Sequence, residues 1–211
     1  MRLIDLSHAI VTGMPQWPGD RQPLRVVRCS EHGTGTCESS RLELGCHVGT
    51  HLDAPRHFLA GAPGVDALPL ERFAGPGLVL RPAPAPGPGP LPASLLDGVA
   101  LGGIEFVLVD TGWSRHWGGP RYYEAWPYLS GELAARLAAA GLKGVGLDTP
   151  SLDAFAGREA HDLFAKAGLV NLENLANLGA LPDRGFRVLA LPLKLADTEA
   201  SPIRAAALLD G

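Results

Sequence analysis

The chain has 211 residues, which is enough for one large domain with a sizeable core. Hydrophobic residues make up 46% and charged residues 19%, an ordinary globular composition that argues against an intrinsically disordered chain. Lys and Arg number 18 and Asp and Glu 22, a net charge of −4 without a basic block, which argues against a nucleic-acid partner.

The N-terminal region predicts a short strand followed by an irregular loop, because prolines and glycines interrupt residues 2–22. That loop carries Trp17. Asp5 interrupts the first residues, and no apolar run approaches the ~18 residues that span a bilayer. We therefore expect a soluble, cytoplasmic protein without a secretory signal or a membrane contact.

Short β-branched or alternating stretches at residues 23–29 and 39–46 predict two half-buried strands. The three cysteines, Cys29, Cys37 and Cys46, lie in this region, and their spacing matches no zinc-finger pattern. Because an odd number of cysteines cannot all pair within one chain, we expect reduced, mostly buried thiols.

The rest of the pattern predicts strands with two short helices among them. One helix is expected over residues 130–140, with Ser130 as its N-cap and Gly141 as its stop, and a second over residues 159–167. Further strands are expected at residues 77–81, 104–110, 143–148, 186–195 and 203–209.

Residues 82–92 hold six prolines and predict an extended, polyproline-like segment. The 27 glycines and 19 prolines approach the ~25–30% typical of low-complexity sequences, so long helices should not dominate. A linker between two domains would leave only about 80 residues for the first core. We therefore expect a loop inside one domain that covers residues 1–211.

The strongest chemical signal is a cluster of histidines. His47, His51 and His57 fall within eleven residues together with Asp53, and imidazole with carboxylate suits a divalent metal such as zinc or manganese. A straight strand would hold residues 47 and 51 ~13 Å apart, so the chain should turn between them, and Gly49 can adopt the positive φ required. A metalloprotease-type helix is disfavoured, because Asp53 would point away and the Glu of that motif is absent.

Two later residues, His161 and Glu173, lie twelve positions apart, after the predicted strand and turn at residues 146–153. Alone, each has an ordinary explanation, a structural histidine and a solvated charge. They gain weight because a site made of His47, His51 and Asp53 leaves a further coordination position for water or other side chains.

The segment from His47 to Phe58 resembles the H-x-G-T-H-x-D-A-P-x-H-F signature of the cyclase family of metal-dependent hydrolases, which includes bacterial kynurenine formamidase and isatin hydrolase. The likeness extends over residues 14–20, 146–153, 169–178 and 201–208. It implies a mixed α/β fold of the swivelling β/β/α type, one domain with a barrel-like β-sheet and flanking helices. It also implies a homodimer or larger homo-oligomer.

The resemblance implies five metal ligands, namely His47, His51, Asp53, His161 and Glu173. Asp53 would bridge two ions, with Zn²⁺ (one or two ions) as the expected cofactor and Mn²⁺ as the alternative. His57 would be the catalytic acid–base group, since an imidazole that binds no metal can accept and return a proton.

The implied reaction is arylformamidase-like, the hydrolysis of N-formyl-kynurenine to kynurenine and formate in tryptophan catabolism, with a metal-activated water. Trp17 and Phe58 are expected to bind this small aromatic amide. Four further aromatic residues have core packing as an equally good explanation, namely Trp113, Tyr122, Tyr123 and Trp126. Because the segment around Glu173 looks more like the isatin-hydrolase pattern, hydrolysis of a C–N bond is a firmer expectation than the substrate.

Three alternatives stay open at this point. A ring-opening hydrolase of a cyclic amide such as isatin would use the same groups. A non-catalytic metal-binding protein is the second, although a structural zinc site is closed, whereas His57 stands free beside the ligands. A redox enzyme that uses Cys46 beside His47 is the third. The residue Arg204 and the segment 82–92 receive no functional role.

Overall fold

The computed structural model describes residues 1–20, 24–33 and 35–209. The strands within these residues are Arg2–Asp5 (β1), Arg25–Ser30 (β2), Ser39–Glu43 (β3), His51–Asp53 (β4), Ala74–Leu80 (β5), Gly89–Leu91 (β6), Phe106–Val109 (β7), Pro127–Leu129 (β8), Gly144–Leu147 (β9), Val170–Glu173 (β10), Phe186–Leu189 (β11), Ala200–Pro202 (β12) and Ala206–Leu209 (β13). The α-helices in the same part of the chain are Gly131–Ala138 (α1) and Glu159–Ala167 (α2).

A nine-stranded mixed sheet forms the body of the molecule, in the order β1-β13-β11-β5-β7-β9-β10-β4-β12. The run from β5 to β10 is parallel, and the other neighbouring pairs are antiparallel. β12 lies at one edge and β13 lies next to the other, yet only residues 203–205 join them, a span of at most ~14 Å. The sheet therefore curls until its edges approach, which confirms the expected mixed α/β fold with a barrel-like sheet.

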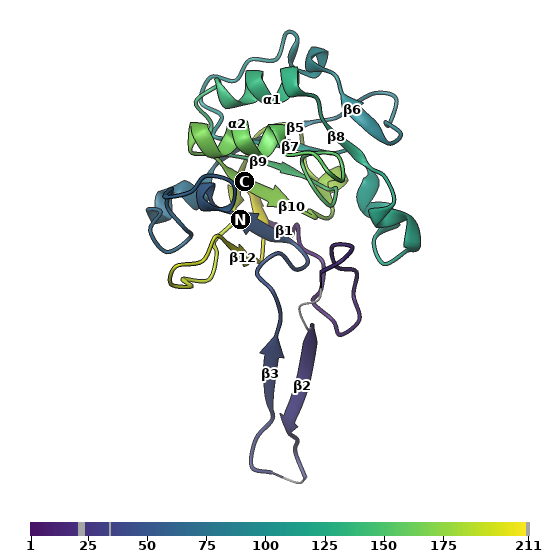
Figure 1. Cartoon of the computed structure of the whole chain (residues 1–211), viewed down its shortest axis with the longest axis vertical. Coiled ribbons are helices and arrows are strands. Elements are labelled where there is room, and N and C mark those ends of the chain that lie inside the picture. Colours follow the sequence, from purple (N-terminus) through teal and green to yellow (C-terminus); the bar gives the residue numbers. More distant parts are fainter. Residues whose placement is uncertain (21–23, 34, 210–211) are drawn as a thin grey trace.

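The two helices cover one face of this sheet, where they lie side by side (Figure 1). Alternate residues of β7 point to opposite faces, so Val107 packs with Leu133 of α1 and Phe164 of α2, while Phe106 belongs to the core on the other face. The Ser130 Oγ accepts a hydrogen bond from the Leu133 N–H at 3.2 Å, which confirms the predicted N-cap.

Both ends of the described chain lie in adjacent strands. β1 pairs with β13 in an antiparallel register that places Arg2 opposite Leu209, so the two ends lie close together (Figure 1). No helix among the described residues is long and apolar enough to cross a membrane.

The strands β2 and β3 form a separate hairpin that extends away from the body (Figure 1). The prediction of two half-buried strands was wrong here, because alternation in the sequence does not reveal whether another layer covers the strand. Val26 and Leu42, which face each other across the hairpin, are both exposed. The prediction of buried thiols was wrong for the same reason, since Cys29 and Cys37 are exposed, although both are free.

The proline-rich segment 82–92 connects two parts of one sheet, because the strands before and after it, β5 and β7, pair with each other. Its last residues form β6, which pairs with β8. The sequence did not predict β4, β6, β8, β10 or β12. Each of these short strands contains a polar residue or a proline, unlike the uninterrupted apolar run of β7, so no strand pattern stands out.

Candidate active site

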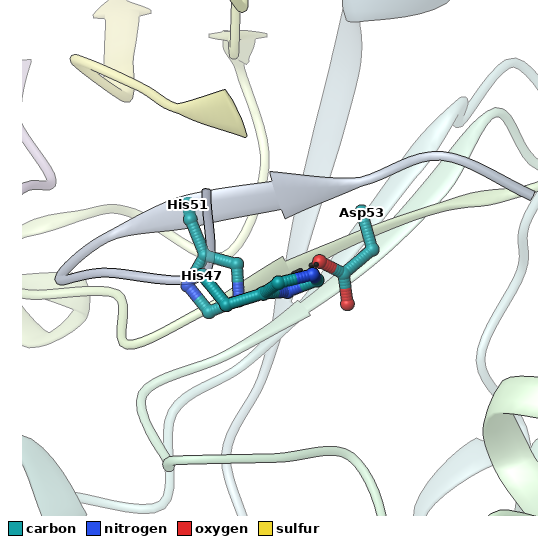
Figure 2. A group of neighbouring side chains, drawn as sticks. All are labelled: His47, His51 and Asp53. Atoms are coloured by element: carbon teal, nitrogen blue, oxygen red, sulfur yellow. Dashed lines mark ion pairs between the residues drawn. The ribbon is translucent and has the colours of Figure 1, made fainter. Parts of the chain in front are cut away.

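The histidine-rich segment folds as a turn followed by β4. Gly49 adopts a φ of +63°, so the chain turns between His47 and His51 as the spacing predicted, and a Cβ at this position would lie 3.0 Å from the Met14 side chain. His51 and Asp53 are two residues apart on β4 and therefore point to the same face. Figure 2 shows the three side chains of His47, His51 and Asp53 converging on one point.

The neighbouring elements bring two more side chains to this point. β4 pairs with β10 in an antiparallel register that places Glu173 opposite His51. His161 lies in the first turn of α2, which packs against β10. The sequence-predicted ligand residues thus come together in two groups, His47–His51–Asp53 and Asp53–His161–Glu173, in each of which the ligand atoms lie within 4.8 Å of one another.

The carboxylate of Asp53 lies between the two groups. Its Oδ1 is 2.9 Å from His47 Nδ1 and 3.5 Å from His51 Nε2, and its Oδ2 is 3.8 Å from His161 Nε2. Glu173 reaches His161 Nε2 at 3.1 Å with Oε1 and His51 Nε2 at 3.4 Å with Oε2. Five donor residues thus surround a small volume.

The hydrogen-bonding state of this volume fits a divalent cation. His51 Nε2 and both carboxylate oxygens of Asp53 are buried and form no well-aligned hydrogen bond with the described residues, although His47 Nδ1 lies 2.9 Å from Asp53 Oδ1. Buried polar atoms with incomplete hydrogen bonding are costly, and charged ones most of all. A cation of the zinc or manganese class, which prefers imidazole nitrogen and carboxylate oxygen, would satisfy all three atoms.

The pKa shifts at this point have opposite signs for acids and bases. Burial raises the pKa of the Asp53 and Glu173 carboxyls, but the neighbouring imidazoles lower it by more. The pKa of Asp53 therefore falls well below its usual value, and the pKa of Glu173 falls to about 2. Burial lowers the pKa of His47, but the Asp53 carboxylate outweighs it and raises the pKa to about 9. The pKa of His161 is likewise raised well above its usual value, despite burial, by Asp153, Asp53 and Glu173. A cation that binds here therefore displaces protons.

His57 lies beside both groups without belonging to either. The short 3₁₀ helix Pro55–His57 places its ring 4.2 Å from the ring of His47 and 6.2 Å from that of His161, measured between centroids. The crowding of protein atoms around it lowers the pKa of His57; Asp53 offsets this in part, and His47 adds to it. An imidazole that is neutral at pH 7 can accept a proton from a reacting group.

A cavity of about 560 Å³ opens onto these side chains. Besides His51, it is lined by the aromatic rings of Trp17, Phe58 and Phe155. The rings of Trp17 and Phe155 stack with their centroids 5.2 Å apart and an interplanar angle of 5°. The ring of Phe58 stacks on His161 at 4.3 Å. The cavity therefore offers flat apolar surfaces close to the polar groups.

The other four aromatic residues do not line this cavity. Trp113, Tyr122 and Trp126 are buried in one cluster, against which Tyr123 and the cavity residue Trp17 pack. Core packing, the alternative that the sequence left open, is therefore their role.

The sequence did not single out several residues of the site. Phe155 lies two residues beyond the turn at 146–153, and Asn174 directly follows Glu173, so proximity to predicted residues was the only signal for both. Glu199, whose Oε1 lies 3.2 Å from His47 Nε2, comes from a distant segment before β12 and left no local signal.

Comparison with known proteins places these residues in a family. A model of the cyclase family matches residues 4–154. Kynurenine formamidase from Bacillus mycoides is 31% identical over 204 residues, which cover 96% of this chain and 95% of that protein. Isatin hydrolase A from Labrenzia aggregata, bound to benzyl benzoate, has a TM-score of 0.88 at 28% identity and covers 100% of this chain and 94% of that one. Isatin hydrolase A from Ralstonia solanacearum has a TM-score of 0.87 at 29% identity, with 99% and 92% covered.

Proposed function

The chain belongs to the cyclase family of metal-dependent hydrolases, and we propose that it hydrolyses the C–N bond of a small aromatic amide. One observation carries this proposal. Two groups of ligand-type side chains share the Asp53 carboxylate, and His57 stands beside them where an aromatic-lined cavity opens. A purely structural metal site is closed and needs no such neighbour, so the arrangement favours catalysis over metal storage.

We assign the metal ligands to His47, His51, Asp53, His161 and Glu173, with Asp53 shared between two positions. Zn²⁺ is the first candidate and Mn²⁺ the second, because imidazole and carboxylate accept both. Such a cation, when bound, lowers the pKa of water to ~7 and polarises a carbonyl oxygen. The chain contributes a fixed cage, since His51 and Asp53 are buried on β4, which is paired on both sides, with β10 and β12.

His57 takes the acid–base role. Its neutral ring accepts a proton from the water that attacks the amide carbonyl, and then gives that proton to the leaving nitrogen as the C–N bond breaks. The lowered pKa of His57 keeps the ring in its accepting form near neutrality. His47, only 4.2 Å away between ring centroids, has both ring nitrogens directed at carboxylates and is not available for this transfer.

Trp17 and Phe58 bind the aromatic part of the substrate. Both line the cavity, and Phe155 extends the surface of Trp17 by stacking on it. Aromatic rings pack against a planar ligand by stacking and edge contacts. The cavity volume of about 560 Å³ lies within the range of small-molecule sites, which is ~300–1,000 Å³.

Two substrates of this class have support. The Bacillus relatives favour an arylformamidase reaction that converts N-formyl-kynurenine to kynurenine and formate, a step of tryptophan catabolism. The fold comparison favours ring opening of a cyclic amide such as isatin, because isatin hydrolase A covers the whole chain at a TM-score of 0.88. In both reactions a water attacks an amide carbonyl, and the leaving nitrogen, which is bonded to an aromatic ring, takes up a proton.

The test is an activity panel with N-formyl-kynurenine, isatin and formanilide. Protein reconstituted with Zn²⁺ or Mn²⁺ is compared with chelator-treated protein and with the His57→Ala variant. We expect hydrolysis of at least one compound, dependent on metal and on His57. If the metal-loaded protein binds its cation tightly but hydrolyses none of the three, the alternative of a non-catalytic metal-binding protein replaces the proposal.

We also propose that residues 1–211 form one domain that assembles as a homodimer in the cytoplasm. An isolated two-stranded hairpin is marginally stable in water, so the β2–β3 hairpin, with Val26 and Leu42 exposed on one face, supports contact with a second copy. A reducing compartment fits the three free cysteines. The proposal includes no nucleic-acid partner, given the net charge of −4 without a basic block. It includes no membrane partner, since no apolar run in the sequence approaches ~18 residues. Light scattering should give a dimer mass that falls to the monomer mass in a Val26→Ser, Leu42→Ser variant.

A further inference from the structure

Asp153 serves two elements of the site at once. It lies in the loop between β9 and α2 and is buried, with 4% of its surface exposed. Its Oδ1 accepts a hydrogen bond from the Ala160 N–H at 2.8 Å, and its Oδ2 accepts one from the His161 N–H at 3.1 Å. The same Oδ2 lies 2.6 Å from His161 Nδ1. One carboxylate therefore caps the helix and holds the imidazole that the helix carries.

The cap is needed because the residue at the usual capping position does not provide one. Arg158 precedes the first turn of α2, but its side chain pairs with the Asp162 carboxylate and caps none of the first backbone N–H groups. Asp153 satisfies N–H groups that would otherwise lack a partner. Asp153 is itself fixed, since its carbonyl oxygen accepts a hydrogen bond from Trp126 Nε1 at 2.8 Å. The start of α2 and the ring of His161 are thus both tied to the same loop residue.

The hydrogen bond to the ring determines which nitrogen is free. An ionised carboxylate can only accept, so His161 must carry a proton on Nδ1. The lone pair of a neutral ring then lies on Nε2, which is 3.1 Å from Glu173 Oε1 and 3.8 Å from Asp53 Oδ2. Three acceptor atoms that face one another at these distances form a cation site. We propose that Asp153 is a positioning residue that fixes the tautomer and orientation of His161, so that the Asp53–His161–Glu173 group can bind its metal ion.

The other two candidate ligand histidines are held in the same way. His47 Nε2 lies 3.2 Å from Glu199 Oε1 while its Nδ1 faces the site. His51 Nδ1 lies 2.9 Å from the Gly49 carbonyl oxygen, which Asn174 Nδ2 also contacts at 2.9 Å, while its Nε2 faces the site. Partners of this kind fix the tautomer of a metal-bound imidazole, and their loss typically weakens metal binding ~10–100-fold. Of the three, only the partner of His161 is a buried carboxylate.

This inference rests on the ligand role of His161 in the proposed function, and its test measures metal binding separately from activity. Metal-free wild-type protein and the Asp153→Asn variant are titrated with Zn²⁺ by calorimetry. The amide keeps the size of the side chain but replaces one accepting oxygen by a donor. We expect affinity at the Asp53–His161–Glu173 group to fall ~10–100-fold. Equal affinity in the two proteins overturns the inference, even if both hydrolyse amides.

A matched control separates positioning from capping. Ser130 caps α1 through the Leu133 N–H, away from the cavity, so Ser130→Ala removes a helix cap without touching the site. We expect both variants to lower the melting temperature, but only Asp153→Asn to weaken Zn²⁺ binding. If Ser130→Ala weakens Zn²⁺ binding equally, or if Asp153→Asn lowers only the melting temperature, Asp153 acts as a cap alone.

The tautomer can also be read directly. In zinc-loaded wild-type protein, a long-range ¹H–¹⁵N NMR spectrum should show the His161 ring protonated on Nδ1 and metal-bound through Nε2. In Asp153→Asn we expect that pattern to be lost or mixed. A wild-type ring protonated on Nε2 would overturn the inference, whether or not the protein hydrolyses an amide.

Discussion

The two groups of candidate ligands contain the same types of side chain but lie in different surroundings. His161 and Glu173 lie on a helix and a central strand, and their side chains are 5% and 8% exposed. The side chain of His47 lies on a turn and is 30% exposed, and its outer partner Glu199 is 38% exposed. The buried group is therefore suited to hold an ion firmly, whereas the open group, beside His57 and the cavity, is suited to reach a substrate. Four experiments test whether the two groups differ in this way.

Replacement of the shared residue should have the largest effect. Asp53→Asn removes a charge from both groups, because each carboxylate oxygen lies near a different group. We expect hydrolysis to fall by more than the ~10⁴-fold upper value for loss of an acid–base group, together with binding of both ions. Metal content by atomic absorption and a circular dichroism spectrum check this. A folded variant that keeps one tightly bound ion would show that the groups do not share Asp53.

Removal of His57 should be next in size and should affect only chemistry. His57→Ala is expected to lower kcat ~10²–10⁴-fold, with the metal content unchanged, because His57 belongs to neither ligand group. His32→Ala, an exposed histidine on the distant hairpin, is the matched control and should keep full activity. Loss of the metal in His57→Ala would indicate that His57 is itself a ligand of the open group.

Changes in the aromatic wall of the cavity, formed by Trp17, Phe58 and Phe155, should act on substrate binding. Phe155 is 52% exposed and stacks on Trp17, so Phe155→Ala removes one face of the wall without touching a ligand. An aromatic pair contributes ~0.5–1.5 kcal/mol, so we expect KM to rise roughly 2- to 12-fold with little change in kcat. Phe155→Tyr should restore the wild-type KM. A fall in kcat alone would place Phe155 in the chemical step.

The smallest effect should appear in the stability of metal-free protein against pH. The folded-state pKa of His47 is about 9, above its unfolded value of about 6.5. Its stabilising contribution is therefore complete below about pH 6.5 and is lost as the pH rises through about 9. The melting temperature of chelator-treated protein should fall by a few degrees over this range, and less in His47→Gln. Metal-loaded protein should not show the fall, since its imidazoles bind the cation; identical profiles would exclude His47 as a ligand.

The sequence was informative where the chemistry is local. His47, His51 and Asp53 lie within seven residues, so their spacing and Gly49 predicted both the metal and the turn. Glu173 joins them only through the pairing of β4 with β10, a register that no local pattern encodes. Its assignment came from family resemblance.

The residues whose roles the sequence did not predict have one property in common. Asp153 and Glu199 act through other side chains and are spatial neighbours of His161 and His47, eight and 152 positions away. Their roles depend on distances that only the folded chain defines. The prediction that the hairpin strands are half-buried was wrong for a related reason. The strands alternate in sequence as buried strands do, but no layer of the described part of the protein packs over them.

The pairing of β1 with β13 has a consequence for chain connectivity. Because Arg2 lies opposite Leu209, a short flexible linker can join the two ends, and new ends can be opened within the mostly exposed segment 82–88 between β5 and β6. Such a circular permutant keeps both ligand groups and the cavity on unbroken elements. The order in which the strands leave the ribosome would then differ from the order in which the natural chain presents them, while the site they build stays the same.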